Sequence, residues 1–274
     1  MRQILVVFLE ARGLPAWLVP DYWFMLTVAI IAGCVMTLVL WRQAGQKASV
    51  ASDLMFWAIP LLFVGAKIFY FLQFGFPKGL NWWSGGGASF YGGLFGILTA
   101  WGVYYLLRPY PLLLFLDSAT PPLAFGLFLG RIGCLLAGCN GGIPSNLPWA
   151  LQFPRWTPVY YSQIQAGLIA KDADSVLPVH PTQLYESLFG LAAFAALLFL
   201  LRRKQWHGQV FFTGMLWYAV YRFATEPLRS DHAGGLHPFE VLSFAQFISL
   251  IVGAAALIGL WLIRRRGLLE SATA

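Results

Sequence analysis

Long apolar stretches constrain this chain more than any other feature of its sequence. A helix needs about 20 apolar residues to cross the hydrocarbon core of a bilayer. Stretches of roughly that length occur at about 22–41, 54–74, 89–107, 111–137, 183–201, 209–227 and 240–263. Of the 274 residues, only 11% are charged, against roughly 25% in a soluble domain. The sequence therefore predicts an all-α integral membrane protein with about seven transmembrane helices, which form a single membrane domain over residues 1–274.

Basic residues are distributed unevenly between the two sides that these spans define. One side carries, in short loops and in the C-terminal tail, Arg42, Lys47, Arg108, Arg202, Arg203, Lys204, Arg264, Arg265 and Arg266. The opposite side carries Arg2, Arg12, Lys78, Arg155, Lys171 and Arg229, spread over longer segments. Because short cytoplasmic loops are enriched in Lys and Arg, we expect the N-terminus outside and the C-terminus inside. Residues 1–20 lack the pattern of a secretory signal, so we expect the first span to remain in the mature protein.

The longest connection between spans, residues 138–182, is expected on the outer side. It is rich in Trp, Tyr and Pro, and a connection of this length within a compact domain is usually functional or disordered. We expect it to form a small extracytoplasmic cap over the outer leaflet. The net charge of +7 is scattered over loops and helix ends, which predicts contact with anionic membrane lipids and argues against a nucleic-acid partner.

A glycine-rich run, Ser84 to Gly93, stands at the outer start of the third predicted span. Glycine lets a ligand approach backbone amides closely, so Gly92 and Gly93 are candidates for binding an anionic headgroup. The alternative is a flexible turn followed by a helix face of small residues that packs against a neighbouring helix. The spacing alone favours neither.

Arg131 lies inside the fourth predicted span, in the run Gly130 to Gly142. An arginine at the centre of a transmembrane helix costs about 2.5–3.5 kcal/mol, which predicts a position facing the helix bundle with an anionic partner. That partner is either a substrate or a structural carboxylate, for which Glu186 and Glu226 are the candidates.

A polar stripe is predicted on the sixth span, where Tyr218, Arg222 and Glu226 follow one another at intervals of four residues. Arg229 comes soon after. Because guanidinium groups bind phosphate through paired N–H donors, Arg131 and Arg222 are candidates for a phosphate clamp. The alternative is that Arg222 and Glu226 neutralise each other.

His180 to Glu186 open the fifth span with the sequence His-Pro-Thr-Gln-Leu-Tyr-Glu. Pro181 and Thr182 suit a helix start, so one interpretation is a helix cap followed by an interfacial tyrosine. Histidine can also act as a base near neutral pH, which makes His180 a candidate proton acceptor.

Cys134 and Cys139 are five residues apart, which is neither Cys-x-x-Cys nor the helical i, i+4 spacing. No nearby histidine completes a zinc site, so we expect no metal and no other cofactor. A disulfide or a small polar packing role fits better if the two residues face an oxidising compartment.

Several ordered motifs resemble the prolipoprotein diacylglyceryl transferase family, bacterial enzymes that begin lipoprotein maturation. The resemblance rests on Gly-Gly-x-Ser-Phe-x-Gly-Gly-Leu at 86–94, Asp117 ahead of the fourth span, Gly-Arg-Ile-Gly at 130–133, His-Pro-Thr-Gln-Leu-Tyr-Glu at 180–186, Tyr-x-x-x-Arg-Phe-x-x-Glu-x-x-Arg-x-Asp at 218–231, and Gln246. These motifs occur in the family's order and extend over most of the chain.

The resemblance implies transfer of the diacylglyceryl group from phosphatidylglycerol to the lipobox cysteine thiol of a prolipoprotein signal peptide, with release of glycerol phosphate. The enzyme would lie in the bacterial cytoplasmic (inner) membrane, with its active site toward the outer leaflet. Catalytic roles are implied for Arg131, Arg222, Tyr218, Tyr91 and His180. Roles in substrate binding are implied for Gly92, Gly93, Cys134, Gly142, Glu186, Glu226 and Arg229.

Two residues depart from the family pattern, namely Tyr91 in place of a histidine and Cys134 in place of an asparagine. A tyrosine, with an ordinary pKa near 10, is a weaker base than histidine. The substrate thiol would then lose its proton to His180 or to water, with Tyr91 as a hydrogen-bond donor, or the chain would catalyse a related reaction.

Two other functions fit the residues less well. One is a membrane transferase that uses phosphatidylglycerol with a different acceptor, and the other is a non-enzymatic protein that binds or transports lipid. Transporters often contain internal repeats, and no convincing repeat is present in this sequence.

Overall fold

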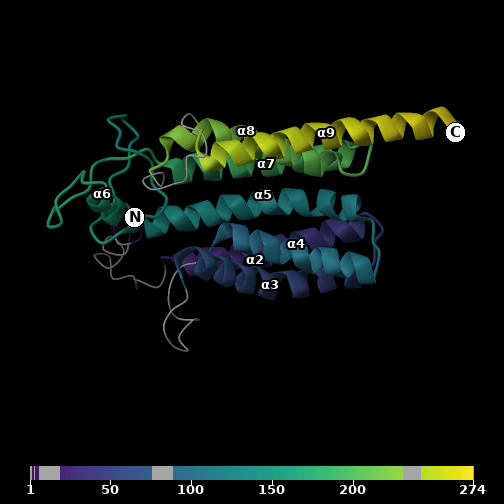
Figure 1. The fold of residues 1–274 in the computed structure, drawn as a ribbon, viewed down its shortest axis with the longest axis horizontal. Helices are drawn as coiled ribbons and strands as arrows, with labels where there is room; N and C mark the ends of the chain where they lie inside the picture. The colour runs from purple at the N-terminus through teal and green to yellow at the C-terminus, as the bar shows by residue number, and fades with distance from the viewer. Residues whose placement is uncertain (1, 3, 6–18, 76–88, 231–241, 274) are drawn as a thin grey trace. The chain divides into compact units, whose positions relative to one another are not determined.

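The computed structural model describes residues 2, 4–5, 19–75, 89–230 and 242–273, and Figure 1 shows their helices. In chain order they are α2 (Tyr22–Gln43), α3 (Ala48–Phe74), α4 (Phe90–Leu107), α5 (Leu112–Ala137), α6 (Pro158–Gln165), α7 (Thr182–Arg203), α8 (Gln209–Thr225), the 3₁₀ helix η2 (Glu226–Leu228) and α9 (Phe244–Thr273). Every predicted span coincides with a helix, and α6 lies within the predicted cap. The prediction of an all-α fold is confirmed.

Five of the helices in the described ranges are long and apolar enough to cross a membrane, namely α2, α5, α7, Ala48–Leu72 of α3 and Phe244–Arg266 of α9. Two further predicted spans, α4 and α8, form shorter helices. Large apolar side chains point outward from the helices, with Trp23 67% and Leu106 81% exposed. Such surfaces are unfavourable in water and suit contact with lipid. The chain is an integral membrane protein.

The chain divides into two compact units, one of residues 1–33 with 116–274 and one of residues 34–115. The sequence predicted one membrane domain, and that remains a prediction.

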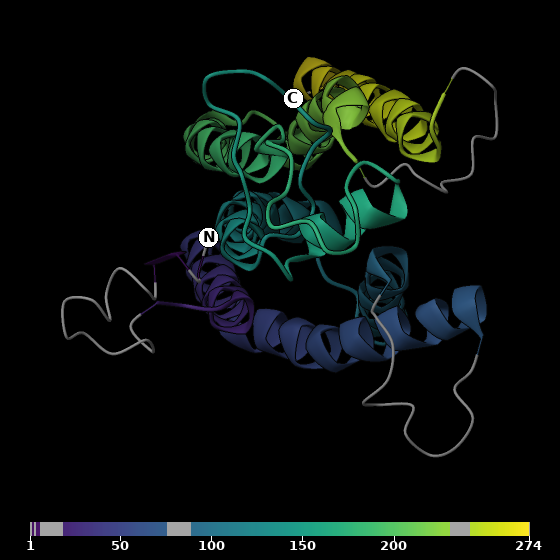
Figure 2. The same ribbon diagram turned by 90° about the vertical axis from the view of Figure 1, so that its left-hand side faces the viewer.

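In the smaller unit, α3 and α4 pack side by side through glycines (Figures 1 and 2). A Cβ atom at Gly92 would collide with the carbonyl of Gly65, and one at Gly96 would collide with the carbonyl of Leu61. Small residues allow such close backbone approach between membrane helices. This geometry favours the packing interpretation of Gly92, while ligand binding by Gly92 or Gly93 remains a prediction.

In the larger unit, α7, α8 and α9 lie next to one another (Figure 1), and α7 also approaches α5 closely. A Cβ atom at Gly190 of α7 would lie 2.8 Å from the backbone nitrogen of Phe128 on α5. One turn earlier on α7, the hydroxyl of Ser187 donates to the carbonyl of Phe128 at 3.1 Å. This contact brings together the C-terminal part of α5 and the first turns of α7, where Arg131 and Glu186 are located.

Asp117 caps the start of α8 from within α5, whereas the sequence placed it ahead of the fourth span. Its carboxylate accepts hydrogen bonds from the Lys204 ammonium at 2.7 Å and from the backbone N–H groups of Gly208 at 2.8 Å and Phe211 at 3.0 Å. A carboxylate at a helix N-terminus satisfies orphan N–H donors and complements the helix dipole. Asp117 therefore has a structural role here.

Replacing Asp117 by asparagine is expected to lower the free energy of unfolding by about 2 kcal/mol, because the buried carboxylate loses its ion pair with Lys204 and one N–H donor is left unpaired. Thermal unfolding in detergent measures this change. The exposed Asp174 provides the matched control, and an Asp117→Asn midpoint equal to that of Asp174→Asn would contradict the capping role.

The predicted cap, residues 138–182, contains a hydrophobic cluster of its own. Phe153, Val159, Tyr160, Val176 and Val179 form its buried centre. Helix α6 packs into this cluster through two of them, and the Thr157 hydroxyl caps the helix by accepting from the N–H of Tyr160 at 3.4 Å. The segment is an ordered structural element, and its place over the outer leaflet remains a prediction.

Candidate active site

Glu186 joins two arginines that the sequence singled out separately. Arg131 Nη2 donates to Glu186 Oε1 at 2.9 Å, and Arg229 Nη1 donates to Oε2 of the same carboxylate at 3.4 Å. These residues come from α5, from the first turns of α7 and from the segment after η2. The structural-carboxylate alternative for Arg131 is thus the geometry observed, with Glu186 as the partner.

Arg222 forms an ion pair with Glu226, four residues further along the chain. The other oxygen of Glu226, Oε1, accepts a hydrogen bond from the Ser243 hydroxyl at 2.6 Å. Glu226 is the first residue of η2, so the predicted stripe continues beyond the end of α8. The neutralising pair is present in the structure.

Tyr218, one turn before Arg222 on α8, lies within electrostatic range of Arg131, Arg222, Arg229 and Glu186. The phenol therefore lies near both ion-pair systems. Three arginines and two glutamates come together in this region. Ionisable residues gathered within a membrane protein are typical of a functional site.

The three guanidinium groups differ in accessibility. The side chains of Arg131 and Arg222 are 19% and 20% exposed, whereas that of Arg229 is 8% exposed. A ligand can therefore reach the first two more easily than the third. Arg229 is placed to hold Glu186, while Arg131 and Arg222 retain surface for a phosphate.

The segment Gly142–Ile143 connects three parts of this region through its backbone. Gly142 N–H donates to the His180 carbonyl at 2.9 Å, and His180 N–H donates to Ile143 at 3.0 Å. On the other side, Ile143 N–H donates to the Leu228 carbonyl at 3.0 Å, and Gly142 bridges to Arg229. This segment thereby fixes both the start of α7 and the position of Arg229.

Replacing Gly142 by alanine is expected to lower the thermal stability of the protein. The new methyl group would lie 2.6 Å from His180 Cβ and 2.8 Å from the His180 carbonyl oxygen. Overpacking of this kind costs about 1–3 kcal/mol. Thermal unfolding measures it. Gly102→Ala is the control, since no atom lies within 4 Å of its Cβ position; equal midpoints for the two variants would show that the crowded segment can yield.

His180 is half-buried at the edge of the site. Its Nδ1 lies 3.4 Å from the hydroxyl of Tyr185, which in turn accepts a hydrogen bond from the Trp149 indole at 2.7 Å. The imidazole is thus oriented by a chain of contacts that begins in the cap. Its role as a base remains a prediction.

The sequence interpretation of Pro181 and Thr182 was right about the start of α7 but wrong about the cap. No side chain caps this helix; the Thr182 hydroxyl donates instead to the Asn140 carbonyl at 2.8 Å. Gln183 Nε2 donates to the Cys139 carbonyl at 2.6 Å. The motif therefore holds the turn that follows α5. Asn140 itself was missed, and its positive φ of 53° has no clear signal in the sequence.

Cys134 and Cys139 are both free thiols. Cys139, beyond the end of α5, donates its thiol proton to the backbone carbonyl of Cys134 at 3.7 Å. Its hydrogen bond with the Cys134 side chain, together with burial, raises the pKa of the Cys139 thiol. Cys139 therefore keeps its proton at neutral pH.

The geometry of this cluster does not test the remaining predicted site residues. Tyr91, Gly92 and Gly93 lie in the first turn of α4, in the smaller unit, and the side chain of Tyr91 is outside the described part of the chain. Residues 84–88 and Asp231 also lie outside the described part of the chain. Their predicted roles remain predictions.

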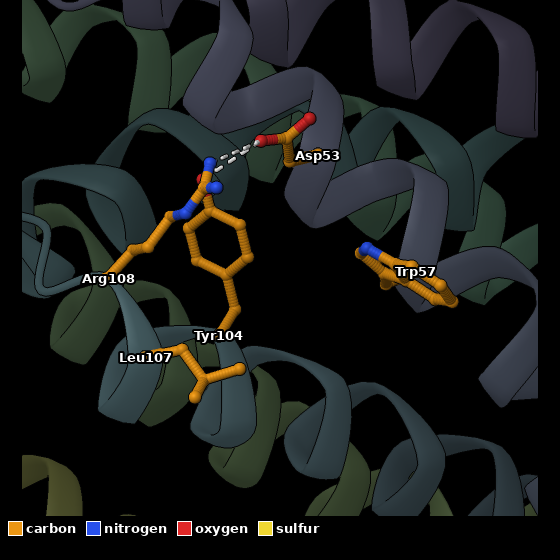
Figure 3. A pocket seen from close by; sticks show the side chains of 5 residues that line it. All are labelled: Asp53, Trp57, Tyr104, Leu107 and Arg108. Carbon is orange, nitrogen blue, oxygen red and sulfur yellow. Dashed lines mark hydrogen bonds and ion pairs between the residues drawn. The ribbon is translucent and has the colours of Figure 1, made fainter.

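Two cavities border the described helices. One, of about 330 Å³, extends from Gly142 to Arg229 beneath α6 and is lined mostly by apolar side chains. The other, of about 390 Å³, lies in the smaller unit, where Asp53 accepts from the Tyr104 hydroxyl at 3.1 Å and pairs with Arg108 at 4.0 Å (Figure 3). Because the ion pair of Asp53 with Arg108 is exposed, it contributes little stability. Of these two cavities, the first is the one that reaches the cluster of Arg131, Arg222 and Arg229, since Arg229 lines it.

Comparison with known proteins gives a consistent match. The family described as prolipoprotein diacylglyceryl transferase matches residues 13–262. A phosphatidylglycerol–prolipoprotein diacylglyceryl transferase from Lactobacillus acidophilus is 31% identical, over 89% of this chain and 85% of that protein. A protein of the same name from Thermus thermophilus is 30% identical over 90% and 94%, and one from Nitratidesulfovibrio vulgaris is 32% identical over 85% of each.

Proposed function

The chain belongs to the prolipoprotein diacylglyceryl transferase family, and we propose that it transfers the diacylglyceryl group of phosphatidylglycerol to the lipobox cysteine of prolipoproteins. The observation that carries this proposal is the pair of guanidinium groups of Arg131 and Arg222, which are each held by a buried carboxylate and are 19% and 20% exposed. A lipid phosphate can bind to the exposed part of these groups, and guanidinium groups bind phosphate strongly.

In the proposed reaction, the sulfur of the acceptor cysteine attacks the glycerol carbon that carries the phosphate. A carbon–sulfur bond forms, the carbon–oxygen bond to the phosphate breaks, and glycerol phosphate leaves with the electron pair. Arg131 and Arg222 stabilise the charge that develops on the departing phosphate ester. Tyr218, between them on the same helix face as Arg222, donates to the headgroup.

The thiol must lose its proton, since the thiolate is the nucleophile. We assign this proton to His180. Support comes from its place at the edge of the arginine cluster, where the Tyr185 hydroxyl orients its ring. The proton then passes to water, so that the histidine is neutral for the next cycle.

We further propose seven membrane spans with the N-terminus outside and the C-terminus inside the inner membrane. The short helices α4 and α8 are then the sixth and seventh members beside the five of full length. The uneven distribution of basic residues supports this orientation. The arginine cluster then faces the outer leaflet, from which both phosphatidylglycerol and the signal peptide enter.

The test is a mass measurement on a lipobox peptide incubated with the purified protein and phosphatidylglycerol. A diacylglyceryl adduct on the peptide cysteine is expected, and a peptide with serine in place of that cysteine serves as the control. Consumption of phosphatidylglycerol without peptide modification would instead indicate a transferase with another acceptor. Binding without turnover would indicate a lipid-binding protein.

A further inference from the structure

The turn that ends α5 brings Cys134 and Cys139 together. Gly138 adopts a positive φ of 72°, and the N–H of Cys139 donates to the Cys134 carbonyl at 3.1 Å while Gly138 N–H donates to Leu135 at 3.3 Å. This pattern is the Schellman motif, in which the residue after the glycine meets the residue five positions earlier. The backbone geometry therefore makes the two cysteines neighbours.

The side chains confirm that the sulfurs are close. The Cys139 thiol donates to the Cys134 carbonyl at 3.7 Å, and Asn140 Nδ2 lies 3.6 Å from Cys134 Sγ and 3.9 Å from Cys139 Sγ. A disulfide requires such proximity of both backbone and sulfur atoms.

The pair also adjoins the arginine cluster. Arg131 Nη1 lies 4.0 Å from Cys134 Sγ, while Nη2 of the same guanidinium contacts Glu186. Cys134 is 7% exposed, and Cys139 is partly exposed. An external reagent therefore reaches Cys139 first, and Cys134 stands behind it in contact with Arg131.

We propose that Cys134 and Cys139 are a site of oxidative modification, at which a small-molecule or protein disulfide converts the two thiols into an intramolecular disulfide. Cys139 is protonated in most molecules at neutral pH, so the attack comes from its minor thiolate fraction after the thiol proton has passed to water. The thiolate attacks the incoming disulfide and forms a mixed disulfide, releasing one thiol. Cys134 then displaces the second thiol and closes the ring. The pair loses two electrons and two protons, and the incoming disulfide is reduced to two thiols.

The bond has a consequence for the site, which rests on the proposed function. Closing it draws Cys134 Sγ toward Cys139 and away from the guanidinium of Arg131, and it ties the end of α5 to the segment before Gly142. We expect the oxidised protein to transfer diacylglyceryl groups at least about fivefold more slowly, because small displacements of positioning groups cost catalytic rate steeply.

The test counts thiols in the purified full-length protein before and after exposure to oxidised glutathione. A maleimide polymer added under denaturing conditions labels each free cysteine, of which the chain has three. We expect three labels before and one after, with an intact mass lower by two hydrogen atoms. Cys34→Ser should change from two labels to none, and Cys139→Ser should keep two.

Other outcomes would overturn the proposal. Unchanged labelling, a mass gain from stable glutathione adducts on either cysteine, or a disulfide that survives in Cys139→Ser would each show that the pair does not form this bond. Equal transferase rates in the two redox forms would overturn the effect on the site. If neither form modifies the lipobox peptide, the proposed function fails, whereas the disulfide is still decided by labelling and mass.

Discussion

Arg131→Ala is expected to lower the rate of diacylglyceryl transfer by about 100- to 1000-fold, the range for removal of a donor that stabilises developing oxyanion charge. Arg131 combines a fixed partner, Glu186 at 2.9 Å, with a partly exposed guanidinium. Without it, the charge on the departing phosphate loses one of its two fixed, accessible donors. The initial rate of thioether product, measured by mass spectrometry, reports the loss.

Two companion variants separate this role from a general effect of lost charge. Arg155→Ala removes an arginine that pairs with the exposed Asp174 in the cap, and it should leave the rate unchanged. Arg131→Lys keeps the charge but loses the forked donor geometry, so its rate should fall between the alanine variant and the parent. A rate for Arg131→Ala equal to that of Arg155→Ala would exclude Arg131 from the chemistry.

Glu186→Gln is expected to lower the free energy of unfolding by about 3–5 kcal/mol, the cost of leaving a buried charge without its partner. The glutamine has nearly the same shape, but Arg131 and Arg229 would both lose their shared carboxylate, in a position where the side chain is only 3% exposed. The effect should exceed that of Asp117→Asn, where Lys204 can reach water. Thermal or denaturant unfolding in detergent measures the difference.

Asp174→Asn again serves as the control, because the carboxylate of Asp174 is almost fully exposed. A midpoint for Glu186→Gln within error of this control would mean that the two arginines find other counterions in the folded protein. In that case Glu186 would not be the residue that holds the two arginines in place.

Individual residues show which parts of the site could be predicted from the sequence. Arg131, Arg222 and Glu226 were found because charged residues within apolar stretches are costly and need partners. The i, i+4 spacing of Arg222 and Glu226 correctly offered an ion pair. For the cysteines the sequence left a disulfide or a polar packing role open, and Gly138 between them was the available signal for the Schellman turn that makes them neighbours.

Contacts between distant segments were beyond the reach of sequence patterns. The choice of Glu186 over Glu226 as partner of Arg131 spans 55 residues, and it depends on how closely α5 and α7 approach at Gly190 and Ser187. The pairing of Gly142 with both His180 and Arg229 depends likewise on three segments meeting. The spacing of residues along a single helix does not predict such contacts between distant segments.

The sequence by itself determined that this protein is a bundle of membrane helices and where each helix runs. The length of an apolar stretch is a local property, and the thickness of the bilayer alone decides whether a helix of that length can cross it. It also determined which ionisable residues had to be buried within that bundle. Only the tertiary structure decided which charges neutralise one another and which guanidinium groups stay open to a ligand, because ion pairs form between side chains that packing brings together from distant parts of the chain.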